Sequence, residues 1–404
     1  MEIADLEVIC FDSGDPLGHL KTRWANLVRK NNPTRIALPK RQLMAIRIST
    51  DDGPEGMVVA NTRKHELAEV EGHLRKALIG EDPLLRDRIW HKMYAMEIPR
   101  LILSAADIGL WDLAGRLADM PCWQLAGGNR TRAKCYVTPH PDFGTPDDYA
   151  EHAVACKARG YGGYKIHGYL TMDPETWEPI KPWSRSFLDA DLDICRAVRD
   201  AVGDDWLLML DPAYIYSFED SVRVAHEIEK LGFGWLESPM WEGDEWMDRY
   251  VELRNQVDIT IVAPEMNPGY HFSRAKWIEA GASDISRIDH YFGGITSCLK
   301  TAALCEAHGM RLELHSTATN GYNLQVLGPT TEEFCTFLEI YDLDPEGGEN
   351  FVGANYLVGE PGNRRPPWIA GQVPKIDAEG YAEIPIEPGA GITIDWDYVN
   401  ANRL

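Results

Sequence analysis

Apolar and polar residues alternate in blocks along most of this chain. From about residue 133 onward, a short apolar run that ends in a polar residue is followed by an amphipathic stretch, a glycine and the next apolar run. The clearest unit is SFEDSVRVAHEIEKLGFGWLESPM, in which Ser217 and Asp220 predict a capping box and Gly232 a helix end. The helical stripe consists of Val222, Ala225, Ile228 and Leu231. Strands that alternate with helices predict a parallel sheet.

The predicted strands end on ionisable residues at a regular spacing. Neighbouring strand ends are 24 to 28 residues apart: Asp211, Glu237, Glu265, Asp289, His315 and Glu339. Each interval is one strand and one helix long, as in a (β/α)8-type TIM barrel. The pattern therefore predicts an α/β barrel whose strand ends converge on one mouth.

The two ends of the chain do not follow this period. Residues 1–131 contain a strand-like run at 37–50 and helical patterns at 65–80 and 101–120, and we expect a separate α+β capping domain there. Residues 132–365 form the predicted barrel, and residues 366–404 read as strands and turns that return to the capping domain.

A long basic segment, residues 11–40, is predicted to be a lid over the mouth, although a solvated loop is the alternative. Its candidates for holding a distal carboxylate of a substrate are Lys21, Arg23, Arg29, Lys30 and Arg35.

The chain is strongly acidic, which limits its partners. Its 63 acidic and 40 basic side chains give a formal charge of −23, so we expect neither nucleic acid nor an acidic membrane as a partner. A small anionic ligand would need local positive charge, such as a lysine or a divalent metal. The eight scattered cysteines lack any C-x-x-C spacing and the acidic N-terminus lacks a signal-peptide pattern, so we expect a cytoplasmic protein.

Three carboxylates on successive strand ends form the strongest candidate site. Asp211, Glu237 and Glu265 would repel one another in a low-dielectric mouth unless a cation lay between them. Oxygen ligands on rigid strands suit Mg²⁺. Any one of these acids alone would more often be a strand cap or half of an ion pair, but the set of three favours the metal.

Two basic groups complete the predicted chemistry. His315 and Asp289 end neighbouring strands, so the carboxylate could fix the tautomer of an acid/base imidazole. Lys165 and His167, in YKIH, share one face of a strand, and we expect each to lower the pKa of the other, so that one could be an unprotonated base. Such a site suits removal of the proton α to a carboxylate.

Several motifs together resemble the enolase superfamily, mandelate racemase subgroup. They are ADIGLWDLAGRLADMPCWQLAGG, YKIH, LDP, LESP, APE and HYFGGIT, in this order and spacing. The resemblance implies a modified (β/α)7β barrel that binds Mg²⁺ through Asp211, Glu237 and Glu265. It also implies that His315 with Asp289 is one acid/base and that Lys165 belongs to the other. Glu339 would hydrogen-bond the substrate carboxylate or enolate.

Two departures from the subgroup pattern affect the expected chemistry. Arg287-Ile288-Asp289 replaces the usual Gln-Pro-Asp, and His167 replaces the second lysine, commonly the base. Either Lys165 removes the proton, the option favoured here because galactarate dehydratases resemble this K-x-H pattern, or His167 does so with Lys165 tuning it.

The predicted mouth is polar, with Asn267, Thr317 and Asn320 among its residues, which favours a polyol substrate. We therefore expect a dehydratase of acid sugars, similar to galactarate dehydratases, with His315 protonating the departing hydroxyl. The alternatives are a racemase or epimerase, a lactone cycloisomerase and, less favoured, a non-catalytic relative. The resemblance also implies a homo-oligomer.

Overall fold

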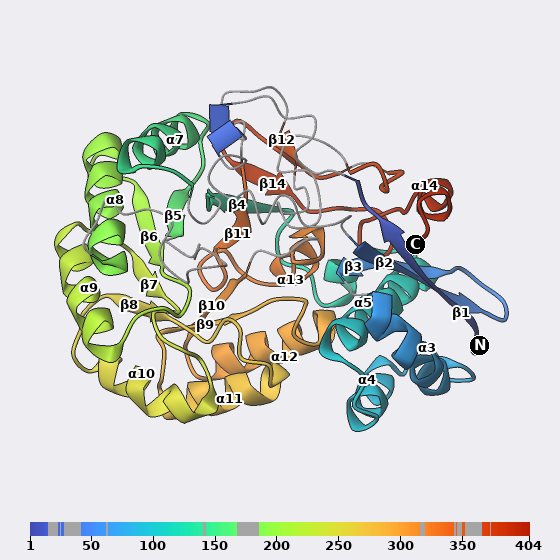
Figure 1. Cartoon of the computed structure of the whole chain (residues 1–404). Helices are drawn as coiled ribbons and strands as arrows, with labels where there is room; N and C mark the ends of the chain where they lie inside the picture. Colours follow the sequence, from blue (N-terminus) through green and yellow to red (C-terminus); the bar gives the residue numbers. More distant parts are fainter. Residues whose placement is uncertain are drawn as a thin grey trace.

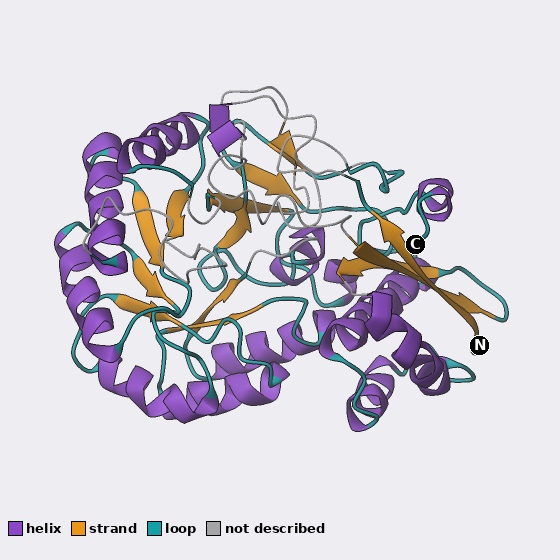
Figure 2. Ribbon diagram, in the orientation of Figure 1, coloured by secondary structure: helices purple, strands orange, loops and turns teal. Residues whose placement is uncertain are grey.

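The structure, a computed structural model, has a barrel and a smaller part that holds both chain termini (Figure 1). It describes residues 1–14, 23–24, 26–27, 42–61, 64–139, 143–167, 186–315, 320–342, 345, 350–351, 366–371 and 373–404. Helices surround the barrel strands on the outside (Figure 2). The predicted α/β barrel with a capping domain is thus confirmed.

Within the described residues, eight parallel strands build the barrel. They are β4 (Arg132–Val137), β5 (Gly163–His167), β6 (Leu207–Asp211), β7 (Trp235–Glu237), β8 (Thr260–Val262), β9 (Ile285–Ile288), β10 (Arg311–Leu314) and β11 (Phe337–Ile340). The strands β4 to β10 are paired in sequence order, and β11 pairs with the other edge of β4. The Leu312 amide donates to the Phe334 carbonyl at 3.0 Å and so joins β10 to the residues before β11.

Helices and short helical turns connect these strands. They are α7 (Pro146–Ala158), α8 (Phe187–Val202), α9 (Phe218–Lys230), η1 (Asp244–Trp246), α10 (Met247–Arg254), α11 (Tyr270–Ala280), α12 (Gly294–Ala307), η2 (Asn320–Tyr322) and α13 (Leu324–Leu327). The predicted start of α9 is confirmed, because the Ser217 hydroxyl accepts from the Asp220 amide at 3.1 Å. Gly232, at φ +66°, follows the helix end.

The cap combines an antiparallel sheet with helices. Its strands are β1 (Ile3–Asp12), β2 (Gln42–Thr50) and β3 (Gly56–Asn61), and its helices are α3 (Lys64–Leu78), α4 (Arg86–Ala95), α5 (Arg100–Leu117) and α6 (Cys122–Leu125). The strands β1 and β3 were not among the predicted elements. β2 pairs with both of them, and its residues 43–46 are buried.

The C-terminal segment contacts both parts of the molecule. Its short strands are β13 (Lys375–Ile376) and β14 (Tyr381–Glu383); β13 pairs with β12 (Asn350–Phe351), and β14 pairs antiparallel with the barrel strand β4. Trp368, Ile392 and Val399 are buried in the hydrophobic core of the cap. The last helix, α14 (Trp396–Ala401), contacts β1.

A buried polar contact joins the cap to the barrel. Asp107 on α5 accepts from the Thr296 amide at 3.0 Å and the Thr296 hydroxyl at 2.6 Å, in the first turn of α12. The Trp111 indole donates to the same hydroxyl at 2.8 Å. A Cβ at Gly294 would lie 2.2 Å from the Asp107 carboxylate, so the close approach requires glycine. The sequence motifs ADIGLWDLAGR and GGIT therefore pack on each other.

Candidate active site

The interior of the barrel changes from apolar to charged along its axis. Tyr136, Met209, Trp235, Val262, Ile285 and Phe337 form a buried apolar cluster inside it. Because side chains alternate along a strand, the residues two positions later point inward one layer closer to the C-terminal strand ends. There the chain places Asp211, Glu237, Arg287 and Glu339, all buried. The charged layer thus lies on an apolar floor.

Asp211, Glu237 and Glu265 come together as predicted. Asp211 ends β6, Glu237 ends β7 and Glu265 lies three residues beyond β8. One oxygen from each lies within 4.8 Å of the others, and all three residues are buried. Burial raises the pKa of Asp211 to about 6 and that of Glu237 to about 8. A raised pKa means that the ionised form is disfavoured, so additional positive charge would help to keep both groups ionised. The donor set, charge and rigidity fit a divalent cation such as Mg²⁺.

Lys165 lies among these carboxylates. Its ammonium is 3.3 Å from Asp211, 3.0 Å from Glu237 and 2.9 Å from Glu339, and the residue is 1% exposed. Burial and Arg287 lower the pKa of Lys165, but Glu237 and Glu339 outweigh them and raise it well above its usual range. The expectation of a lysine pKa lowered by His167 was therefore wrong, because the carboxylates dominate its surroundings.

The predicted contact between His315 and Asp289 is present. The Nδ1 atom of His315 lies 2.6 Å from the Asp289 carboxylate, and its Nε2 atom lies 2.8 Å from Glu265. Burial lowers the pKa of His315, but Glu265 and Asp289 outweigh it and raise the pKa to about 10. These contacts favour the imidazolium, the form that a general acid needs. The departure at Arg287 and Ile288 thus leaves the pair intact.

His167 and His315 are the more accessible members of the site. Their side chains are 14% and 22% exposed, against 1% for Lys165. His167 Nε2 lies 3.6 Å from the Asp211 carboxylate. Both imidazoles therefore lie on the solvent side of the buried charged layer, where a substrate would enter.

Arg287 is part of the site, although sequence reasoning noted it only as a departure from a motif. Its guanidinium lies 2.6 Å from Glu237 and 2.5 Å from Glu339, and it donates to the Tyr136 hydroxyl at 3.2 Å. The signal was present in the sequence, because Arg287 stands two residues before Asp289 and so faces the same side of the strand.

The remaining predicted substrate contacts differ in what the structure shows. Asn267 is buried, and its amide donates to the Glu242 carbonyl at 2.8 Å and to Asp244 at 3.0 Å, so a substrate contact would require one of these bonds to open. Arg23 forms ion pairs with Asp148 and Glu151 on α7. The other candidates lie outside the described residues: Lys21, Arg29, Lys30, Arg35 and Thr317.

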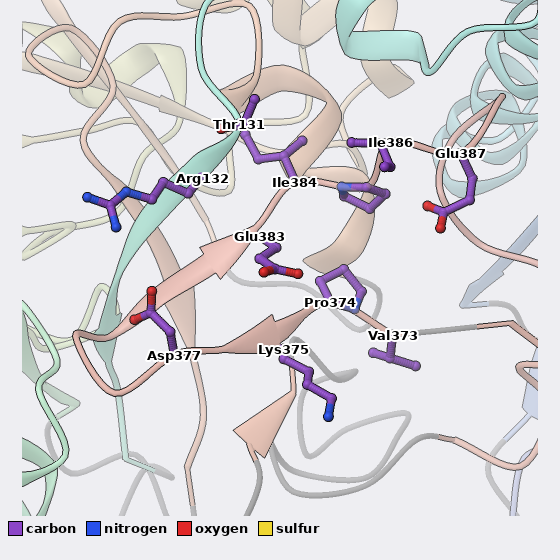
Figure 3. A pocket seen from close by; sticks show the side chains of 11 residues that line it. Thr131, Arg132, Val373, Pro374, Lys375, Asp377, Glu383, Ile384, Ile386 and Glu387 are labelled. Atoms are coloured by element: carbon purple, nitrogen blue, oxygen red, sulfur yellow. The ribbon is translucent and has the colours of Figure 1, made fainter.

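A groove of about 520 Å³ lies away from this chemistry. Figure 3 shows its lining around β13, β14 and the start of β4, including Arg132, Lys375 and Glu383. Because Arg132 begins β4, this groove is at the opposite end of that strand from the catalytic candidates. Residues at that face of such barrels serve stability rather than catalysis.

Comparisons with known proteins match this architecture. A model of the mandelate racemase/muconate lactonizing enzyme N-terminal domain matches residues 21–127, and one described as enolase C-terminal domain-like matches residues 148–398. None of the helices in the described part of the chain is long and apolar enough to cross a membrane.

Three relatives are all named as dehydratases. A crystal structure of D-glucarate dehydratase from Agrobacterium tumefaciens complexed with magnesium superimposes with a TM-score of 0.79 and 30% identity, over 100% of this chain and 99% of that one. D-galactonate dehydratase from Klebsiella pneumoniae is 28% identical over 91% of this chain and 92% of its own. L-rhamnonate dehydratase from Saccharopolyspora erythraea is 26% identical over 87% and 83%.

Proposed function

Because the chain belongs to the enolase superfamily, we propose that it is a Mg²⁺-dependent dehydratase of acid sugars, a hydro-lyase acting on an aldonate or aldarate. The observation that carries this proposal is the convergence of two proton-transfer groups on one carboxylate cluster. Lys165 contacts Asp211 and Glu237, and His315 contacts Glu265. The dehydratase names of the three relatives support elimination over the other reactions of such sites.

The metal would be held by Asp211, Glu237 and Glu265. The chemistry that Mg²⁺ supplies when bound is stabilisation of the negative charge that develops on the substrate carboxylate, together with compensation for the carboxylates around Lys165. Three buried carboxylates, with one oxygen from each within 4.8 Å of the others, are the feature of this chain that fits such a cation.

The side chains then divide the proton transfers. Lys165 would act as the free amine, once a bound cation has offset the carboxylates that raise its pKa, and would accept the α-proton of the substrate. The electron pair of that C–H bond moves into an enolate of the substrate carboxylate, which then forms a double bond to the β-carbon as the β-hydroxyl leaves. His315, kept as imidazolium by Asp289, donates a proton to that hydroxyl, which departs as water. The resulting enol tautomerises to a 2-keto-3-deoxy acid. Glu339 holds Lys165 at 2.9 Å with one oxygen and contacts Arg287 with the other. Because an ionised carboxylate only accepts hydrogen bonds, Glu339 would hydrogen-bond the substrate carboxylate or enolate only after gaining a proton.

The test uses Mg²⁺ and a panel of mono- and di-acid sugars in D₂O, with ketone formation and α-deuterium followed by NMR. Lys165→Ala should abolish both signals. His315→Asn should abolish the ketone while α-exchange continues, because the base is still present. The exposed His308→Asn is the matched control and should behave as wild type.

Other outcomes assign the competing reactions. Deuterium without ketone in the wild type would indicate a racemase or epimerase, and an isomer without either would indicate a cycloisomerase. His167→Asn should retain exchange; its complete loss would make His167 the base. Silence of the wild type across the panel would contradict the proposal.

The proposal includes the substrate class, the cellular compartment and the oligomeric state of the enzyme. A small anionic sugar acid as substrate agrees with the relatives, and the eight buried free cysteines agree with a reduced cytoplasm. A homo-oligomer agrees with exposed apolar side chains such as Trp241, 56% exposed, and Ile386, 71% exposed. Light scattering after size-exclusion chromatography measures the assembly.

A further inference from the structure

Arg287 is a fully buried cation that the proposed reaction does not use. It is the third residue of β9, and its side chain shares the inward face with Ile285 and Asp289. Burying a guanidinium is costly unless its charge and its N–H groups are paired. The groups that Arg287 contacts therefore indicate its role in the site.

The guanidinium contacts two carboxylates that Lys165 also contacts. Arg287 Nε lies 2.6 Å from Glu237 Oε1, which is also 3.0 Å from the Lys165 ammonium. Arg287 Nη2 lies 2.5 Å from Glu339 Oε2, while the other oxygen of Glu339 faces Lys165 at 2.9 Å. Nη2 also donates to the Tyr136 hydroxyl at 3.2 Å. Glu339 thus has one oxygen on each cation.

These two carboxylates come from opposite walls of the barrel. Along the ring of strands, β7, which carries Glu237, and β11, which carries Glu339, are separated by β4, β5 and β6 on one side and β8, β9 and β10 on the other. No hydrogen-bonded strand pair fixes the distance between their side chains. Lys165 reaches both carboxylates with one ammonium, whereas Arg287 reaches them with two nitrogens of one planar group. Nη2 donates to Glu339, and Nε forms an ion pair with Glu237 without a hydrogen bond. A planar group with two contact points fixes the orientation of its partners, which a single ammonium does not.

We propose that Arg287 is a positioning residue that fixes the metal ligand Glu237 relative to Glu339 across the barrel. The inference rests on the proposed function, because it assumes that Glu237 binds a divalent cation. A positioning role and a purely electrostatic role predict opposite changes in metal affinity when Arg287 is removed. A cation that only adds positive charge repels Mg²⁺, so its removal would tighten metal binding; a positioning cation orients the ligand, so its removal weakens binding.

The experiment measures Mn²⁺ binding by the electron paramagnetic resonance signal of free Mn²⁺, with Mg²⁺ as competitor. Arg287→Lys keeps the charge but not the fork, and Arg287→Met removes both. Each should raise the Kd for Mn²⁺ about 10- to 100-fold, the usual cost of losing a group that orients a metal ligand. Arg196→Lys, on the exposed face of α8, is the matched control and should keep the wild-type Kd.

Thermal unfolding separates positioning from folding. A merely structural role would lower Tm and leave the Kd unchanged, and an unchanged or smaller Kd in both Arg287 variants would overturn the inference. If those variants do not fold, Tyr136→Phe decides: it removes one partner of Nη2, so a larger Kd supports the inference and an unchanged Kd overturns it. Wild-type protein without Mn²⁺ binding would instead overturn the proposed metal site.

Discussion

Lowering the pH from 7 to 5 should remove the contribution that one buried histidine, His152 on α7, makes to the stability of the barrel. Its Nε2 atom lies 2.8 Å from the Asp342 carbonyl and its Nδ1 atom 2.9 Å from the Tyr164 hydroxyl. These partners assign a neutral ring that donates from Nε2 and accepts at Nδ1. His152 thus joins α7 to β5, the strand of Lys165, and to the residues that follow β11.

The magnitude follows from the pKa of His152. Burial lowers it to about 4, although the Asp342 carbonyl acts in the opposite direction, whereas the ordinary value is 6.5. Between these two values the unfolded chain binds more protons than the folded one, so the stability is complete above pH 6.5 and is lost as the pH falls toward 4. From pH 7 to pH 5 the loss is about 2 kcal/mol at ~1.4 kcal/mol per pKa unit.

Urea unfolding followed by tryptophan fluorescence at pH 7 and pH 5 measures this loss. His152→Gln keeps a donor but cannot be protonated, so its unfolding free energy should fall by about 2 kcal/mol less than that of the wild type over the same range. The exposed His308→Gln should keep the full wild-type loss. A His152→Gln protein with the same pH dependence as the wild type would refute the reasoning.

Three further predictions concern the metal, the substrate and the junction of the two domains. Mg²⁺ at a hundredfold excess over its Kd should stabilise the wild type by about 3 kcal/mol. Asp211→Asn should remove most of that gain in thermal unfolding; an equal gain would place the metal elsewhere. Glu339→Gln should lower kcat more than it raises KM, since Glu339 holds Lys165 for the chemical step, and steady-state kinetics would contradict this if only KM changed. Thr296→Val should cost about 2 kcal/mol of stability, because it leaves the Trp111 indole without its acceptor and Asp107 with only the residue-296 amide as donor from α12. An unchanged Tm would show that the junction does not need the hydroxyl.

Local pattern was enough to predict the barrel and the residues at its strand ends. The spacing of Asp211, Glu237 and Glu265 along the chain reflects one strand and one helix per unit, and parallel strands present their ends on the same side. The capping of α9 by Ser217 was predicted for the same reason, since a helix start depends on residues three positions apart. The strands β1 and β3 were missed because they form by pairing with β2 and by packing against helices far away in the chain, α14 on β1 and α5 on β3.

The sequence by itself determined which ionisable residues this protein places at the barrel mouth, because the period of strand and helix is a local property. Only the tertiary structure decided how those charges interact. In the sequence, Arg287 is recognisable only as a residue that differs from the usual Gln-Pro-Asp motif. Closure of the barrel brings it between Glu237 and Glu339. The same closure surrounds Lys165 with carboxylates and reverses the pKa shift expected from its neighbour His167. Charge interactions depend on distance through space and on burial, and neither quantity is present in the spacing of residues along a chain.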